Sequence, residues 1–562
     1  MISNSFTIVI GEDPTITGPS TVASEFKRAS VAVFAANPRH IALDTRDDGF
    51  SLFIGETHSD EALTARPAGG TSFSYNDLRQ TLAVECDRLG TGIVFWKRAG
   101  NHVLFSNRLE NLVDAGSEPD WSSIQQYLHT GFTVGDTTFF RDVYQTLPNQ
   151  RIEVEVTGSS VSLSASDRGI HSVDITHPDA LIDQISAELS ATLKAVHPSI
   201  LMMSAGWDSR TLLLESEAGI RGAYSHGDLS SREVGLARKL SGGQRMDHLF
   251  ADVRSAPITN ALVDEMLEQL GFGIFPIWFA GARNVQQWKD APIMSGVLGE
   301  LLGGHYGIMS WGSRQQKLLS SVALISDSFI GEDRIRSIAE DYSTPPMTHW
   351  FVSDKGQEML DKHRGETRQR SLDAIEACYK ETGMWQRALE DFNMAHRARQ
   401  YILKQPQTAS STVGYTIPFS SERLTDLVRA LDFSYRVHNK TNRRILQSRR
   451  PSLLNAPMAA TLVHAKYPVL LQEVSRAARV LSENAMSMLG RKPPRLGWFN
   501  FEHLYDTDIL HEMADSLSSP IWDKPKMHQT LRNNPGNKVD AGATLDMICK
   551  IKTVDHHLRT IS

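Results

Sequence analysis

Cysteine is scarce in this sequence. Three cysteines stand among 562 residues, and Cys86, Cys378 and Cys549 lie too far apart along the chain to form a CxxC pair. An odd number of scattered cysteines argues against a disulfide framework or a cysteine-ligated zinc site, and it is typical of a reducing compartment. The first residues have no basic segment ahead of a long apolar run, so we expect no signal peptide and a cytoplasmic protein.

Long hydrophobic runs and an excess of basic residues are also missing. No segment reaches the roughly 20 uninterrupted apolar residues that a membrane-spanning helix needs. The formal net charge is −7, which does not favour binding to nucleic acid. With 41% hydrophobic and 22% charged residues, the composition is that of a soluble globular protein. We therefore predict no membrane and no nucleic-acid partner, and about 150 residues per domain gives roughly two to four domains.

The first 165 residues are rich in strand-like segments. Short β-branched and aromatic runs are separated by Gly, Asp, Asn and Pro, namely SFTIVI, HIALDT, FSLFIG, GIVFWKR, HVLFSN and RIEVEVT. Helical segments are expected at Tyr75–Leu89 and Trp121–Leu128. The pattern predicts a sheet-rich domain with some helices.

The pattern changes after Asp167, where helices and strands alternate. Apolar residues recur every four positions over 178–195, which predicts an amphipathic helix that begins at Pro178. The elements expected next are a strand at Ile200–Met203, a helix from Arg210, a strand at Gly222–Ser225, a helix from near Ser231 and a strand at His248–Val253. Such alternation predicts a parallel sheet with right-handed crossovers. Residues 256–480 are expected to be mainly helical, and residues 481–562 to form a loosely structured helical appendage.

The most informative segment is LMMSAGWDSR at 201–210, a buried strand followed by a loop of small residues that leads into a helix. Ser204 and Gly206 let the backbone come close to a ligand, and the N–H groups ahead of a helix bind anions. The charge of Asp208 would by itself repel phosphate, but it suits a Mg²⁺ ion that bridges phosphate oxygens. The Walker lysine is absent. The alternative is a serine-capped helix start after a core strand, without a ligand.

This loop resembles the Ser-Gly-Gly-x-Asp-Ser pyrophosphate loop of ATP pyrophosphatases, with Ala205 in place of the first glycine. Further segments, in the same order, resemble motifs of the asparagine synthetase family: TFFRDVYQTLPN at 138–149, YSHGDLSSRE at 224–233, SGVLGELLGGHY at 295–306, YTIPF at 415–419 and RRIL at 443–446. The resemblance covers residues 1–480. It implies an α/β protein in which an N-terminal αββα sandwich of the NTN-hydrolase type (1–165) precedes a helix-rich, parallel-sheet ATP-pyrophosphatase domain (166–480) and the appendage (481–562).

The resemblance also implies a set of site residues. Those expected to bind ATP and pyrophosphate are Met203, Ser204, Ala205, Gly206, Asp208, Ser209, Ser225 and Gly296. Asp208 and Glu300 are expected to hold Mg²⁺, and Glu300, Lys440 and Arg443 to be catalytic. Glu300 either replaces the family's second acid or stands beside a position taken by Gly299, and it could also be an acid at a helix start. Either Lys440 or Arg443 takes the role of the family lysine, or both belong to a solvated basic face.

The beginning of the chain departs from the family pattern. Glutaminases of this family use a cysteine at position 2, whereas Ile2 stands here. The resemblance therefore implies a ligase without a glutaminase of its own, which uses ATP to adenylate a substrate carboxylate and releases AMP and pyrophosphate. Relatives of that kind, β-lactam synthetases and lasso-peptide cyclases, form an amide or macrolactam in a secondary metabolite or peptide. The expected partners are a small-molecule or peptide substrate and partner enzymes of a biosynthetic pathway.

Two other functions stay open. The chain could use free ammonia to amidate a metabolite or a surface sugar, or it could be a degenerate, non-catalytic protein that binds nucleotide. The departures at Ala205, Gly299 and Arg443 favour a degenerate protein, whereas the retained Asp208 argues against it.

Histidine and tryptophan add little to the functional argument. His556 and His557 have no metal-binding sequence context, so we expect them on a surface tail. Trp207, Trp278 and Trp288 are expected to belong to the core or to line a pocket.

Overall fold

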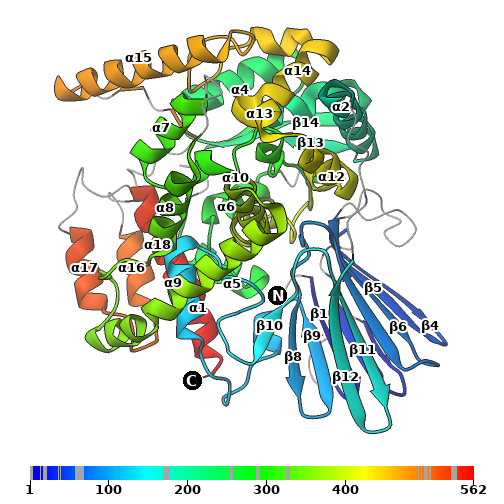
Figure 1. The fold of residues 1–562 in the computed structure, drawn as a ribbon. Coiled ribbons are helices and arrows are strands. Elements are labelled where there is room, and N and C mark those ends of the chain that lie inside the picture. The colour runs from blue at the N-terminus through cyan, green and yellow to red at the C-terminus, as the bar shows by residue number, and fades with distance from the viewer. Residues whose placement is uncertain are drawn as a thin grey trace.

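The computed structural model describes most of the chain, and all statements below refer to that part. The described residues are 4–12, 14–16, 22–35, 37, 39–56, 69–168, 177–196, 198–252, 257–285, 291–324, 330–491, 493–494, 496–498, 504, 508–532 and 541–561. Figure 1 shows a β-sandwich at one end of the molecule and a helix-rich body around a third sheet at the other. Ile2 and Trp288 lie outside the described residues.

The N-terminal part is a sandwich of two antiparallel sheets, each with six strands in the described residues. The first has the order β10-β8-β9-β1-β3-β2, with β1 (Ser5–Gly11), β2 (Val22–Glu25), β3 (Ala29–Phe34), β8 (Phe95–Ala99), β9 (His102–Ser106) and β10 (Val143–Gln145). The second has the order β12-β11-β7-β6-β5-β4, with β4 (Ile41–Arg46), β5 (Gly49–Glu56), β6 (Gly69–Asn76), β7 (Thr81–Cys86), β11 (Gln150–Thr157) and β12 (Ser160–Asp167). The predicted sheet-rich domain is thus present.

Alternate residues of both sheets meet in one apolar core. Phe6 of the first sheet lies edge-on to Phe73 of the second, with ring centroids 5.1 Å apart, and Phe73 in turn contacts Phe105 at 5.8 Å. This core joins strands that are far apart in the sequence, so it fixes the two sheets face to face.

The helix expected at Tyr75–Leu89 is wrong. The segment forms the β6–β7 hairpin, in which Tyr75 pairs with Leu82. The physical reason is that every second residue is buried on either side of the turn, which places one face of each strand in the sandwich core. The tertiary core therefore decides the conformation of this segment, which was expected to be helical.

The helix expected at Trp121–Leu128 is confirmed as α1 (Trp121–Thr130), whose first turn is capped by the carboxylate of Asp120. It packs mainly against α9 (Asp354–Thr382) and α18 (Ala541–Arg559). The described residues of 4–168 contain no other α-helix. Two helical layers outside a sandwich, as the αββα expectation requires, are therefore not found in that part of the structure.

The third sheet is parallel, as predicted, and has the order β15-β14-β13-β16-β17 in the described residues. Its strands are β13 (Ser199–Met202), β14 (Ile220–Gly227), β15 (His248–Asp252), β16 (Ile293–Met294) and β17 (Tyr415–Thr416). The helix α2 (Pro178–Ala195) precedes β13, α3 (Trp207–Thr211) and η2 (Leu212–Ala218) follow it, and α4 (Arg232–Gly243) follows β14. The helix expected from Arg210 begins earlier, at Trp207, because Gly206 adopts the extended conformation of an N-cap.

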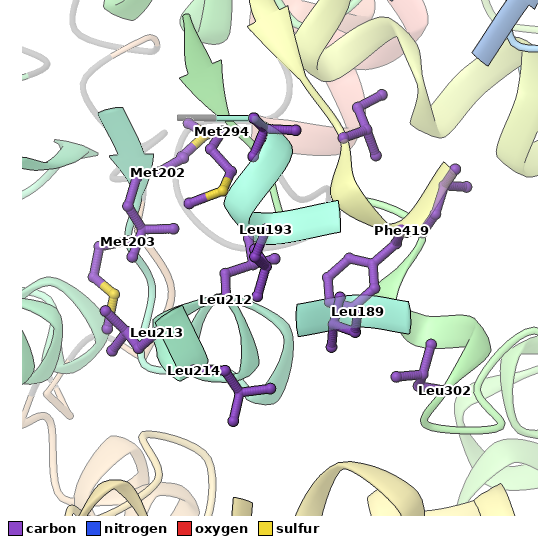
Figure 2. Close-up of a cluster of buried hydrophobic side chains, with 14 of the residues drawn as sticks. Leu189, Leu193, Met202, Met203, Leu212, Leu213, Leu214, Met294, Leu302 and Phe419 are labelled. Carbon is purple, nitrogen blue, oxygen red and sulfur yellow. The ribbon is translucent and has the colours of Figure 1, made fainter. Parts of the chain in front are cut away.

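The parallel sheet is buried on both faces. Leu189 and Leu193 of α2, Met203 after β13 and Phe419 after β17 belong to the same buried cluster (Figure 2). Covered strands of this kind read as continuous apolar runs, which explains why Ile200–Met203 was recognisable from the sequence.

Helices make up most of the remaining chain. Those between residues 257 and 343 are α5 (Asn260–Leu270), α6 (Pro276–Arg283), η4 (Gly299–Leu301), η5 (Ile308–Ser310), α7 (Arg314–Ala323) and α8 (Glu332–Ser343). After α9 come α10 (Trp385–Phe392), the π-helical η7 (Asn393–Ile402), α11 (Lys404–Gln407), η8 (Pro418–Ser420), α12 (Glu422–Ala430), α13 (Phe433–Arg436), η9 (Val437–Asn439), α14 (Lys440–Arg449) and η10 (Pro451–Asn455). The last are α15 (Val469–Met488), α16 (Ile509–Asp515), α17 (Lys524–Arg532) and α18.

The expectation of a loosely structured appendage at 481–562 is wrong for the described residues. Most of α18 is buried, and it shares a core with α1, α5 and α16. The carboxylate of Asp555 in α18 accepts hydrogen bonds from the backbone of Ser518 and Ser519 and from the Trp522 indole. This buried carboxylate therefore ties α18 to the segment that precedes α17. Among the described helices, none has the length and apolar character needed to cross a bilayer.

Candidate functional site

The strand order of the parallel sheet reverses at β13. Strand β13 lies in the middle of the sheet, and the chain moves from it to β14 and β15 on one side, whereas β16 and β17 lie on the other. Ligands of such sheets bind outside the carboxyl ends of the strands at the point where the order reverses. A cleft of about 580 Å³ lies there. Its walls include Ser204 from the loop after β13 and Asp208 and Ser209 from α3. They also include Ser295–Leu298 from the loop after β16 and Glu300 from η4.

The loop after β13 is held in shape by its own serines. The Ser204 and Ser209 hydroxyl oxygens are 3.0 Å apart, and the Ser204 hydroxyl accepts a hydrogen bond from the N–H of Gly206. The N–H of Ser204 donates to the Ser209 hydroxyl. Ala205, which stands where the loop that it resembles has a glycine, is not among the residues with positive φ. The replacement therefore introduces no backbone strain of the kind that only glycine avoids.

The side chain of Arg210 anchors this loop to another part of the chain. Its buried guanidinium donates to the carbonyl of Ala205 and to the carbonyls of Leu453, Ala456 and Pro457. The loop thus rests on η10 and the residues after it, and its position is fixed before any ligand arrives.

Two glycines let the second loop approach the first. A Cβ on Gly296 would lie 3.2 Å from the N–H nitrogen of Ser209, and one on Gly299 would lie 2.7 Å from Oδ1 of Asp208. Between them Leu298 adopts φ 71°, a conformation that L-residues rarely take. Strain of this kind persists where the surrounding structure enforces it, and it clusters at functional sites.

The structure brings Asp208 and Glu300 together in the cleft. Burial, and then the neighbouring Glu300 carboxylate, raises the pKa of Asp208 to about 8, and burial raises the pKa of Glu300. Two carboxyl groups that disfavour ionisation beside each other form a pair that a divalent cation would stabilise as carboxylates. Glu300, and not Gly299, therefore lines the cleft beside Asp208.

Lys440 and Arg443 do not line the cleft. They line a separate surface hollow with Arg444, Gln447, Ser448 and Val469. The ammonium of Lys440 donates to the carbonyl of Ser434 at 3.0 Å, and the guanidinium of Arg443 lies over the Trp207 ring at 5.8 Å from its centroid. Arg443 therefore contacts Trp207 at the start of α3 but does not line the cleft that Asp208 lines.

Four of the expected nucleotide-binding residues shape the loop without lining the cleft: Met203, Ala205, Gly206 and Ser225. The Ser225 hydroxyl donates to the carbonyl of Met203 at 2.6 Å, and Nε2 of His248 lies 3.0 Å from it. This hydroxyl is therefore used inside the sheet.

An aromatic wall completes the cleft and was mostly missed from the sequence. Trp278, expected in the core or a pocket, lines it and stacks on Trp498 at 5.7 Å. Burial lowers the pKa of the adjacent His226 to about 3, which keeps this imidazole neutral. Tyr401 also lines the cleft, and its hydroxyl donates to Asp546 at 2.8 Å. Trp498 and Asp546 come from distant segments and had no local sequence signal.

The expectation that His556 and His557 lie on a surface tail is wrong. His557 is only 4% exposed, and Nε2 of His556 lies 2.9 Å from the Glu110 carboxylate. Glu110, His556 and His557 could together offer ligands to a metal ion. The guanidinium of Arg108, 3.2 Å from the same Glu110 oxygen, already supplies a positive charge there. The half-buried Glu110 carboxylate is therefore already engaged by Arg108 and His556.

None of the three cysteines has the character of a nucleophile. Burial raises the pKa of Cys86 and Cys549, and it raises the pKa of Cys378 to about 12. Reactive thiols have lowered pKa values in electropositive, accessible surroundings.

In comparisons of the sequence with protein-family models and with curated proteins, no match was found.

Proposed function

We propose that this protein is an ATP-dependent ligase that adenylates a substrate carboxylate and then forms an amide, with release of AMP and pyrophosphate. The observation that carries the proposal is the meeting of a small-residue, hydroxyl-bearing loop with two acids at the crevice of a parallel sheet. The loop suits phosphate oxygens through its hydroxyls and backbone N–H groups. Asp208 and Glu300 suit Mg²⁺, which when bound would neutralise phosphate charge.

The proposed chemistry has two displacements. A carboxylate oxygen of the substrate attacks the α-phosphorus of ATP, the bond to the bridging oxygen breaks, and pyrophosphate leaves with the electron pair. An amine then attacks the activated acyl carbon, AMP leaves, and the amine proton is released. The residues of the cleft would bind and orient the reactants, because positioning and electrostatic stabilisation dominate phosphoryl-group chemistry.

The shape of the cleft supports a substrate larger than a single amino acid. Its volume of about 580 Å³ falls in the range of sites for drug-sized ligands. The wall formed by Trp278, Trp498, Phe275 and Tyr401 offers apolar and aromatic surface next to the phosphate loop. A peptide or secondary metabolite that carries both the carboxylate and the amine fits these features, in the manner of a lasso-peptide cyclase or β-lactam synthetase.

The cysteines support an amine source other than glutamine. Cys86, Cys378 and Cys549 have raised pKa values, so none suits a glutaminase. A ligase of this kind takes its amine from the substrate. If ammonium salts increased turnover, free ammonia and not a substrate amine would be the nitrogen source.

A second candidate is a non-catalytic nucleotide-binding protein. Lys440 and Arg443 lie outside the cleft, so neither contributes a positive charge to the departing pyrophosphate. This placement favours the second candidate. Product analysis separates the two: pyrophosphate and AMP formation requires the ligase, whereas the alternative binds nucleotide without turnover.

The test is thermal melting with Mg²⁺ and a non-hydrolysable ATP analogue. At a hundredfold excess over Kd, binding stabilises the folded state by about 2.7 kcal/mol, and the expected rise in melting temperature is about 2–4 °C. Asp208→Asn should abolish the magnesium-dependent rise. Asp373→Asn, at an exposed position of α9, is the matched control and should keep it. No magnesium-dependent rise in the wild type would overturn the proposal.

A further inference from the structure

A second cavity lies between the sandwich and the helices, away from the cleft. It has two lobes of about 110 Å³ each. The residues common to both lobes are Ile93, Asn107, Arg108, Leu270, Phe272 and Lys404. Cavities of this size admit a small molecule of a few heavy atoms and exclude a nucleotide.

The ammonium of Lys404 faces this cavity without an anionic partner in the described residues. Lys404 is the first residue of α11, and its Nζ lies over the Phe272 ring, 4.4 Å from the centroid. Burial, and then the charges of Arg399 and Arg108, lowers the pKa of Lys404 to about 8. A cation–π contact offsets only part of the cost of burying an ammonium.

The two neighbouring arginines are also incompletely satisfied. Arg108, 7% exposed, donates through Nη2 to Glu110 and to the carbonyl of Glu268, while its Nη1 is buried and has no partner in the described residues. Arg399, 1% exposed, donates to the carbonyls of Gly90 and Thr146, and its Nη1 is likewise buried without a partner there.

The nearby acids do not balance these three cations. Glu110 is engaged by Arg108 and His556. Asp87 accepts hydrogen bonds from Leu89 and Thr91, and burial raises its pKa, which favours the neutral carboxyl group. Among the described residues that line the cavity, the two cations Arg108 and Lys404 outnumber the one carboxylate, Glu110. Such an excess of positive charge is costly in a dry interior unless an anion compensates it.

We propose that this cavity binds a small oxyanion or carboxylate between the Lys404 ammonium and the free N–H of Arg108. Charge-assisted hydrogen bonds to two cations would give it both affinity and orientation. The inference is independent of the proposed ligase activity, because the cavity shares no lining residue with the Asp208–Glu300 cleft.

The experiment is thermal melting of the full chain without Mg²⁺, in EDTA, with inorganic phosphate or acetate against chloride at equal ionic strength. We expect a saturable rise in melting temperature with at least one of the two anions. Phosphate against acetate distinguishes an inorganic oxyanion from a carboxylate. In Lys404→Met the apparent affinity should fall at least about tenfold.

The controls separate this site from the phosphate loop. Lys239→Met, at an exposed position of α4, should keep the wild-type response. A response that is lost in Ser209→Ala and kept in Lys404→Met would place the anion at the loop after β13 and overturn the proposal. Lys404→Gln serves as a second variant if Lys404→Met fails to fold. An equal anion response in the wild type and in both Lys404 variants, or no response of the wild type to either anion, would overturn the proposal.

Discussion

The sandwich and the parallel-sheet region bury their strands by different rules. In the sandwich, one face of each strand meets the opposite sheet, as Phe73, Leu82 and Val154 do, while the other face is partly exposed. In the parallel sheet, β13 is buried on both faces. Antiparallel strands place their ends alternately at opposite edges, whereas parallel strands bring all carboxyl ends to one edge.

This difference explains where the polar groups gather. The loops after β13 and β16 start from the same edge, so Ser209, Asp208, Gly296 and Glu300 converge although nearly a hundred residues separate them in the sequence. The hairpins of the sandwich offer no such convergence. We infer that the sandwich supports the fold and the parallel sheet carries the chemistry.

The largest expected effect is on stability and comes from the sandwich core. Phe73→Ala removes a ring that contacts Phe6 and Phe105, and it should lower the free energy of unfolding by about 3–5 kcal/mol. Urea denaturation measures this loss, and Ser74→Ala, exposed on the same strand, is the control. Below its melting temperature the Phe73→Ala variant should still bind the ATP analogue. A loss of analogue binding by the folded variant would contradict the inference that the sandwich supports the fold and the parallel sheet carries the chemistry.

The next effect concerns the contact between the two regions. Glu56 of β5 accepts hydrogen bonds from the backbone N–H of Ile417, at 2.6 Å, and from Thr416 of β17. Burial raises the pKa of Glu56 from its ordinary value of 4.5 to about 7. The folded state then binds more protons than the unfolded state between these values, so stability falls as pH rises from 4.5 to 7.

This pH dependence can be isolated with Glu56→Gln. The difference in unfolding free energy between wild type and variant should change by on the order of 3 kcal/mol between pH 4.5 and pH 7.5. The stability of the wild type should fall relative to that of the variant as pH rises. Urea denaturation at several pH values measures it. A difference that stays constant with pH would show that Glu56 does not bind its proton more tightly in the folded state.

A third effect should fall on the site itself. In Gly299→Ala the new methyl group would meet the Asp208 carboxylate, so we expect a loss of about 1–3 kcal/mol in stability and loss of the magnesium-dependent response. Gly235→Ala, where the structure leaves open space in α4, should be neutral or slightly stabilising. Unchanged analogue binding in Gly299→Ala would contradict the placement of Mg²⁺ at Asp208.

The smallest effect compares two serines near β13. Ser225→Ala removes a hydroxyl used inside the sheet and should cost about 1–2 kcal/mol in stability without changing the Kd of the analogue. Ser209→Ala, on the cleft wall, should raise that Kd by about tenfold. Calorimetric titration measures both. A larger effect from Ser225 would mean that the nucleotide lies along β14.

Local patterns predicted much of the parallel-sheet region. The α2 helix, the buried run at β13 and the start of α4 near Ser231 each depend on neighbouring residues, and the structure confirms them. The β6–β7 hairpin was misread because its conformation depends on a core built from distant strands.

The same limit applies to the site. Asp208 stands in a recognisable loop, but Trp498, Tyr401 and Asp546 reach the cleft through tertiary packing that no local pattern records. His557 was misplaced for this reason, since its burial depends on α18 packing beside Glu110. Charge imbalance around Lys404 likewise becomes visible only when the sandwich and α11 are side by side.

The most direct test of the central claim is amide hydrogen exchange of the full chain with and without Mg²⁺ and the non-hydrolysable ATP analogue. The account predicts slower exchange in peptides that cover 203–211 and 293–302, with little change in β1 and β11 of the sandwich. Protection confined to the sandwich, or none at the ends of β13 and β16, would contradict it.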